Sequence, residues 1–222
     1  MKKNLTELVF ILDRSGSMGG LESDTIGGFN SLIGKQKKEE GEAVVSTILF
    51  DDKVDVIHDR KDIKDIPALT EKDYFVRGCT ALLDAVGSAI NHVSSVQNKT
   101  DEEDRPSKTL FVITTDGLEN ASKEYSFKDI KNLISRHKEK DNWEFMFLGA
   151  NIDAIGVASD MGISKDMAAN YNCDSTGTSL NYEVLADAVS TARKCEPGLL
   201  KKAFLGGKWK ASIDADYSAR KN

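Results

Sequence analysis

A run of five apolar residues, Leu8 to Leu12, ends abruptly at Asp13. Because apolar and polar side chains do not alternate within this run, it predicts a strand that is buried on both faces. Strands of this kind are typical of parallel sheets, whose two faces are covered by helices. The rest of the chain must then supply more strands and the helices that cover them.

Strand and helix patterns alternate along the remaining sequence. Further strands are predicted at residues 44–50, 53–58, 110–114, 143–148 and 167–173. Apolar residues at helical spacing predict helices near residues 22–38, 80–93, 126–137, 152–161 and 180–192. The strand at 53–58 returns from a tight turn at Asp51 and Asp52, and so forms a hairpin. The alternation predicts a single α/β domain with a mainly parallel sheet and one antiparallel hairpin.

The composition limits the kinds of partner that the protein is expected to bind and the cellular compartment in which it is expected to lie. The 30 Lys and Arg residues against 36 Asp and Glu residues give a net charge of −6, which argues against nucleic-acid binding through phosphate neutralisation. No apolar run approaches the roughly 20 residues of a membrane span, and Leu8–Leu12 is too short for a signal peptide. Three cysteines without a CxxC pair argue against a disulfide framework. We therefore expect a cytoplasmic protein that binds neither nucleic acid nor a membrane.

A polar motif directly follows the first predicted strand. Asp13, Ser15 and Ser17 stand at alternate positions around Gly16, a residue that lets the loop fold so that their side chains converge. One carboxylate and two hydroxyls are hard oxygen donors, which suit Mg²⁺, Mn²⁺ or Ca²⁺ rather than zinc. Taken alone, the motif fits a turn followed by a helix N-cap equally well.

Two further segments bring oxygen donors to the same edge of the predicted sheet. Thr80 stands at a junction between a loop and a helix, and Asp116 directly follows the strand at 110–114. Each has a structural explanation of its own, as an N-cap and as a turn residue. Because doubly wound sheets bind ligands at the carboxyl ends of their strands, the three segments together predict one site with two carboxylates and three hydroxyls.

The complete pattern resembles that of von Willebrand factor type A (vWA) domains of the intracellular bacterial type. Their metal-ion-dependent adhesion site (MIDAS) is written DxSxS, then Thr, then Asp often followed by Gly, and the resemblance covers roughly residues 5–195. The matching residues, which the resemblance implies as metal ligands, are Asp13, Ser15, Ser17, Thr80 and Asp116. The implied fold is a Rossmann-like, doubly wound, mainly parallel six-stranded sheet with one antiparallel edge hairpin and helices on both faces. Residues 1–195 would form the vWA-like domain, and residues 196–222 a basic C-terminal tail that is either disordered or docked.

The resemblance also implies a function. One divalent cation, Mg²⁺ or else Mn²⁺ or Ca²⁺, would leave a coordination position open for an acidic side chain of a partner protein. We expect an adaptor or assembly factor rather than an enzyme, with an AAA+ ATPase as a candidate partner. The alternative is a metal-dependent hydrolase of phosphate esters. Against it, Ser15 stands where haloacid-dehalogenase-type phosphatases carry an acid/base Asp, and a serine cannot take over that protonation role near neutral pH.

Other polar residues near the predicted site receive structural assignments. Cys79 is expected to be a small buried apolar filler. Asn151 and Asp153 follow the predicted strand at 143–148 and are expected to cap the short helix after it. Glu119 and Asn120 lie near Asp116 in the sequence and are expected to be solvated loop residues, with a supporting role around the metal ligands as the alternative.

Overall fold

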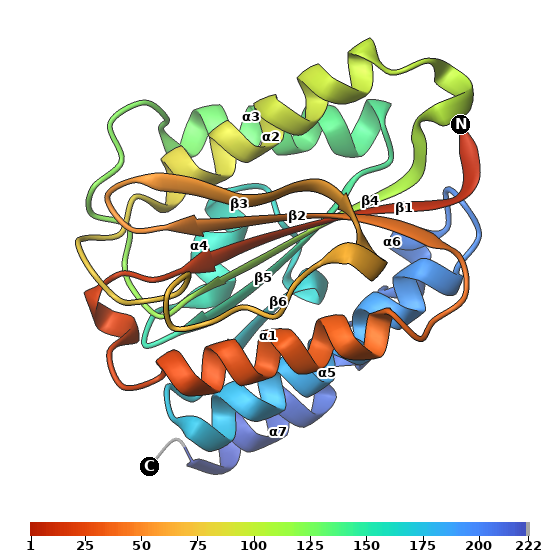
Figure 1. The fold of residues 1–222 in the computed structure, drawn as a ribbon. Helices are drawn as coiled ribbons and strands as arrows, with labels where there is room; N and C mark the ends of the chain where they lie inside the picture. Colours follow the sequence, from red (N-terminus) through yellow and green to blue (C-terminus); the bar gives the residue numbers. More distant parts are fainter. Residues whose placement is uncertain (221–222) are drawn as a thin grey trace.

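The computed structural model describes residues 1–220, in which six strands form one mixed sheet (Figure 1). The strands are β1 (Lys2–Asp13), β2 (Glu42–Phe50), β3 (Val54–Asp62), β4 (Pro106–Thr115), β5 (Glu144–Ala150) and β6 (Ala168–Tyr171). Their order across the sheet is β3-β2-β1-β4-β5-β6. The edge strand β3 runs antiparallel to β2, and the other neighbouring pairs are parallel. The predicted doubly wound fold with one antiparallel edge hairpin is confirmed.

The helices cover both faces of the sheet (Figure 1). They are α1 (Glu22–Gln36), α2 (Leu82–Lys99), α3 (Phe127–Lys140), α4 (Ala154–Asp160), α5 (Ser175–Lys194), α6 (Leu200–Ala203) and α7 (Ala211–Arg220). On one face α3 packs between α2 and α4, and on the other face α5 packs against α1 and α7. Right-handed crossovers explain the two layers, because the chain moves from β1 toward one edge of the sheet and from β4 toward the other. None of the helices described within residues 1–220 is both long and apolar enough to cross a membrane.

The central strand β1 is hydrogen-bonded to β2 on one side and to β4 on the other. Its residues Leu8 to Leu12 are buried, as the apolar run predicts. The strand begins at Lys2 rather than at Leu8, and it includes the buried polar residues Thr6 and Glu7. The carboxylate of Glu7 accepts a hydrogen bond from Gln97 Nε2 at 2.7 Å. A pattern of apolar residues cannot reveal a strand segment that is buried through polar contacts of this kind.

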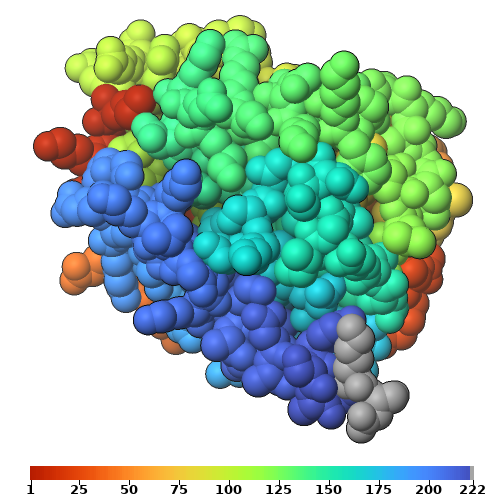
Figure 2. All heavy atoms as spheres, turned by 180° about the vertical axis from the view of Figure 1, so that it is seen from behind, coloured from red at the N-terminus to blue at the C-terminus, as the bar shows by residue number. Residues whose placement is uncertain are grey.

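Residues 196–220 fold back onto the domain. Leu200 on α6, Phe204 after it and Ile213 on α7 are buried, and α7 packs against β6 and α5. The indole of Trp209 donates a hydrogen bond to the carbonyl oxygen of Asp166 at 2.7 Å. Figure 2 shows this segment in blue as a continuous band across the surface. The last two residues of the predicted tail, 221 and 222, lie outside the described residues.

Candidate metal centre

Three chain segments meet at the carboxyl edge of the sheet, where the parallel strands end. Asp13 is the last residue of β1, and Ser17 lies in the short 3₁₀ helix η1 (Gly16–Met18) that follows. Thr80 lies two residues before the first residue of α2, and Asp116 directly follows β4. The adjacent pairing of β1 with β4 brings Asp13 and Asp116 to the same place on this edge. The sequence therefore predicts the location of these segments correctly.

Three hydroxyl groups from two of these segments form a cluster. Ser15 Oγ lies 3.0 Å from Ser17 Oγ, and Thr80 Oγ1 donates to Ser15 Oγ at 3.0 Å. The third segment touches the cluster through Gly117, where an added Cβ would lie 2.8 Å from Thr80 Oγ1 and 2.9 Å from Ser17 Oγ. A residue without a side chain is required there, because the backbone after Asp116 lies directly against the hydroxyls.

Asp13 is fixed by hydrogen bonds to both of its carboxylate oxygens. The backbone N–H of Ser15 donates to Oδ1 at 2.7 Å, and Thr115 Oγ1 donates to Oδ2 at 2.5 Å. The side chain is almost fully buried. Burial raises the pKa of Asp13 to about 6, the bonds from Thr115 and Ser15 oppose that rise, and the charge of Asp116 adds to it. Thr115 is a supporting residue that the motif does not reveal, although it stands next to Asp116 in the sequence.

The carboxylate of Asp116 is also buried, but one of its oxygens has no partner. Its Oδ2 accepts a hydrogen bond from Cys173 Sγ at 3.4 Å, whereas its Oδ1 is buried and has no hydrogen-bond partner among residues 1–220. Burial raises the pKa of Asp116, and hydrogen bonds from Ser17 and Cys173 oppose the rise. A buried carboxylate oxygen without a partner costs free energy, so Oδ1 is available for a ligand.

The donor set fits a hard divalent cation. Two carboxylates and three hydroxyls are oxygen ligands of the kind that Mg²⁺, Mn²⁺ and Ca²⁺ prefer. Within residues 1–220 no three His, Cys, Asp or Glu side chains come together in a cluster that could hold a metal ion. A cation at this edge would therefore depend on the serine and threonine oxygens as well as on the carboxylates.

The loop after Asp116 fastens the Thr80 segment. The backbone N–H of Thr80 donates to Asn120 Oδ1 at 3.0 Å, and the Thr80 carbonyl accepts from the backbone N–H groups of Asn120 and Ala121. Glu119 Oε2 accepts from the N–H of Leu83 at 3.0 Å and so satisfies a free donor in the first turn of α2. Asn120 is an exposed loop residue, as expected, whereas Glu119 is half-buried. Both side chains also link the loop after Asp116 to the segment that carries Thr80.

An ion-pair cluster at the β2–β3 hairpin joins the loop that carries Ser15 to the loop that carries Thr80. Arg14 is only 3% exposed, and its Nε donates to Asp51 Oδ2 at 2.8 Å. Arg77 Nε binds the same oxygen at 2.7 Å, and both guanidinium groups also pair with Asp55. The ring of Phe75 lies 5.4 Å and 5.3 Å from the two guanidinium carbons. The tip of the β2–β3 hairpin therefore holds together the loops that carry Ser15 and Thr80.

The structure differs from the sequence-based assignments of Cys79 and Asn151. Cys79 is exposed, so the prediction of a buried filler is wrong. Asp153 caps α4, as predicted, by accepting from the N–H of Gly156 at 3.0 Å. Asn151 forms a side-chain hydrogen bond with Cys173 instead. No pattern in the sequence indicates that Cys173, far along the chain, lies against Asp116.

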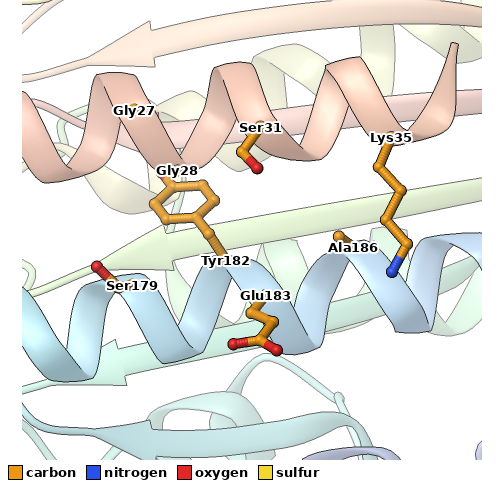
Figure 3. Close-up of a pocket in the computed structure, with 8 residues that line it drawn as sticks. All are labelled: Gly27, Gly28, Ser31, Lys35, Ser179, Tyr182, Glu183 and Ala186. Atoms are coloured by element: carbon orange, nitrogen blue, oxygen red, sulfur yellow. The ribbon is translucent and has the colours of Figure 1, made fainter.

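A separate groove of about 380 Å³ lies between α1 and α5 (Figure 3). The ring of Tyr182 lies against Gly28, where an added Cβ would be 2.4 Å from Tyr182 Cδ2. This close approach lets Tyr182 reach Thr114 of β4 with a side-chain hydrogen bond. Lys35 at the groove pairs with the exposed carboxylate of Asp187 on the next turn of α5. None of the residues that line this groove belongs to the cluster of oxygen donors at the carboxyl edge of the sheet.

The topology and the position of the site are those of open, doubly wound α/β proteins. The chain moves outward from β1 in one direction and from β4 in the other, and the oxygen cluster lies between the carboxyl ends of these two strands. Open α/β sheets bind ligands at such a switch point. Within that class, the fold is that of a von Willebrand factor type A domain.

Solved structures with this fold include proteins from Porphyromonas gingivalis, Catenulispora acidiphila and a mussel. The vWF domain of the type V pili tip protein Mfa5 from Porphyromonas gingivalis has a TM-score of 0.60 at 8% identity, over 88% of this chain and 98% of that chain. Von Willebrand factor type A from Catenulispora acidiphila has a TM-score of 0.56 at 14% identity, over 86% and 43%. Proximal thread matrix protein 1 from the mussel byssus, with a zinc occupied MIDAS motif, has a TM-score of 0.57 at 13% identity, over 85% and 46%.

These similarities concern the fold. The chain spans less than half the length of the Catenulispora and mussel chains, at 43% and 46%. No protein-family model and no curated protein matches the sequence.

Proposed function

We propose that this chain is a protein-interaction module that depends on a divalent metal. One cation, Mg²⁺ or else Mn²⁺ or Ca²⁺, would bind at the oxygen cluster and would in turn bind an acidic side chain of a protein partner. The proposed ligands are Asp13, Ser15, Ser17, Thr80 and Asp116. The module would act without catalysis, as an adaptor or assembly factor.

The unpaired Oδ1 of Asp116 carries this proposal. It is a buried carboxylate oxygen beside a cluster of hydroxyls, and no group within residues 1–220 donates a hydrogen bond to it. A cation supplies the missing positive charge, and the neutral hydroxyls leave that charge only partly compensated, so an external carboxylate would still be attracted. The zinc in the MIDAS motif of the mussel protein supports a divalent cation for this fold.

The residues around the proposed cation site have different roles. Asp13 supports the centre as a fixed carboxylate, because both of its oxygens already accept hydrogen bonds from the protein. Ser15 Oγ lies within hydrogen-bond distance of both Ser17 Oγ and Thr80 Oγ1, and Gly117 leaves room beside these hydroxyls. Waters that Mg²⁺ retains would be exchangeable for the carboxylate of a partner.

Calorimetric titration of the chelator-treated protein with Mg²⁺ and with Mn²⁺ tests the metal. We expect binding to the wild type and a loss of affinity of more than about tenfold in Asp116→Asn, because even outer-shell partners of a metal contribute that much. Asp101→Asn is the matched control, since Asp101 is exposed and its side chain makes no capping hydrogen bond. Equal affinities of the wild type and Asp116→Asn would contradict the proposal.

Binding of a protein partner is tested by an affinity-capture experiment with the immobilised protein. A protein partner should be retained in Mg²⁺ and released by EDTA, and replacing its acidic contact residue by the amide should abolish retention. A cytoplasmic location of the intracellular bacterial type, and an AAA+ ATPase as partner, belong to the same proposal. Hydrolysis of a phosphate ester that is lost both in EDTA and in Asp13→Asn would instead identify an enzyme.

A further inference from the structure

We infer that Cys173 is a positioning residue for Asp116, and this inference rests on the proposed metal-binding function. Cys173 lies two residues beyond the end of β6, while Asp116 directly follows β4. The two residues are therefore brought together by the sheet, across the carboxyl end of β5. The thiol acts on the carboxylate and is not itself a proposed ligand of the metal.

The contact joins the thiol to one particular oxygen. Cys173 Sγ lies 3.4 Å from Asp116 Oδ2 and donates its hydrogen to it. The other oxygen, Oδ1, is left buried without a partner. A carboxylate that is held at one oxygen cannot rotate freely, so the thiol, together with the hydrogen bond from Ser17, limits which oxygen is kept for the cation.

A second contact orients the thiol itself. Asn151, which directly follows β5, forms a side-chain hydrogen bond with Cys173. Its backbone has a φ of 55°, a left-handed conformation that residues other than glycine adopt infrequently. The ends of β4, β5 and β6 are thus linked by one short chain of hydrogen bonds, from Asn151 through Cys173 to Asp116.

The chain contains a matched control for this contact. Cys195 is half-buried like Cys173, but its thiol donates to the carbonyl oxygen of Ala192, one turn earlier, at 3.2 Å. Replacing Cys195 by Ala therefore removes an equally buried thiol at a distance from the oxygen cluster. The effect of losing sulfur from the protein can in this way be separated from the effect on Asp116.

The test compares the Mg²⁺ and Mn²⁺ affinities of the full chain and three variants, Cys173→Ala, Cys173→Ser and Cys195→Ala. We expect Cys173→Ala to lower the affinity by about tenfold, the lower end of the range for outer-shell partners, because a thiol is a weak donor. Cys173→Ser should restore most of the affinity through its hydroxyl donor, and Cys195→Ala should leave it unchanged. The melting temperatures of the metal-free variants should stay close to that of the wild type.

Three outcomes would overturn the inference. Wild-type affinity in Cys173→Ala, with metal binding by the wild type intact, would remove Cys173 from the site and leave the proposed function standing. Affinity as low in Cys173→Ser as in Cys173→Ala would show that packing of the sulfur matters rather than donation. No metal binding by the wild type would remove the proposed function, and the positioning role with it.

Discussion

The two buried carboxylates of the candidate metal centre are held in different ways. Asp13 has protein donors on both oxygens, whereas Asp116 is held by Cys173 and Ser17, and its Oδ1 accepts no hydrogen bond from residues 1–220. Asp13 is therefore already fixed by the protein alone. In the proposed function, a bound cation would supply the missing partner of Asp116 Oδ1.

Gly117→Ala should weaken metal binding without unfolding the protein. Its Cβ would lie 2.8 Å from Thr80 Oγ1 and 2.9 Å from Ser17 Oγ, so the hydroxyls must move apart. Overpacking of this kind typically costs about 1–3 kcal/mol of stability, and the displaced hydroxyls should lower Mg²⁺ affinity in calorimetry. Gly27→Ala is the control, because nothing lies within 4 Å of its added Cβ. Unchanged affinity in Gly117→Ala would show that the hydroxyls do not bind the metal together.

At the scale of single residues, the sequence predicts which residues belong to the site when the motif specifies their type and spacing. Ser15, Ser17 and Thr80 are found together in the structure, as the pattern predicts. Cys173 could not be predicted, because its contact with Asp116 depends on how far β6 extends beside β5. Cys79 was assigned wrongly because a cysteine at a loop can face either the core or the solvent, and the local sequence does not distinguish the two.

At the scale of secondary-structure elements, the hairpin tip between β2 and β3 connects the loops of the metal centre. Asp51 was predicted as a turn residue, and it does accept a hydrogen bond from the N–H of Lys53 at 2.9 Å. Its second oxygen binds Arg14 and Arg77, a role that no local pattern indicates because the two arginines belong to other loops. A turn residue therefore also determines the relative positions of the loops that carry Ser15 and Thr80.

Asp51→Ala should destabilise the fold by about 3–5 kcal/mol, the usual result of removing one partner from a buried ion pair. Asp51 is fully buried, and the change leaves the buried guanidinium of Arg14 without its main partner. The control is Asp187→Ala, since Asp187 is 71% exposed in its pair with Lys35, and exposed pairs contribute at most about 1 kcal/mol. Urea unfolding measures both. A loss in Asp51→Ala no larger than in the control would show that the cluster does not hold the loops.

At the scale of the whole molecule, alternation of apolar strands with amphipathic helices was sufficient to predict the sheet. The polar extension of β1 through Thr6 and Glu7 was not predictable, because its burial depends on partners from α2 and β3. Nor did the sequence decide whether residues 196–220 dock. The buried Leu200 and Phe204 are four residues apart, but Ile213 follows only nine residues later, so no helical pattern continues through the segment.

Glu7→Gln should change how the stability of the whole molecule depends on pH. Burial raises the pKa of Glu7 above its usual 4.5, although the charge of Arg60 and the bond from Gln97 oppose the rise. Since the folded state then binds the proton more tightly, protonation stabilises the folded state below the usual pKa. That stabilisation is lost as the pH rises through the raised value. Glutamine does not ionise, so the variant should gain stability relative to the wild type on going from acid to neutral pH.

Urea unfolding of Glu7→Gln and the wild type at about pH 4.5 and about pH 7.5 measures this difference. The exposed Glu71→Gln is the control, and its difference from the wild type should be smaller and change little between the two conditions. A stability difference for Glu7→Gln that stays constant, or that shrinks toward neutral pH, would contradict the prediction.

The length of β1 has a practical consequence for attaching the protein to a support. With a rise of about 3.3 Å per residue, Lys2 and Asp13 lie roughly 36 Å apart at opposite ends of one strand. Figure 1 shows the N-terminus at the opposite end of β1 from the arrowhead of that strand. A tether at Met1 would point the cluster toward the solution. A tether near Arg220, which pairs with Asp174 beside Cys173, would hold it close to the support and shield it from large binding partners.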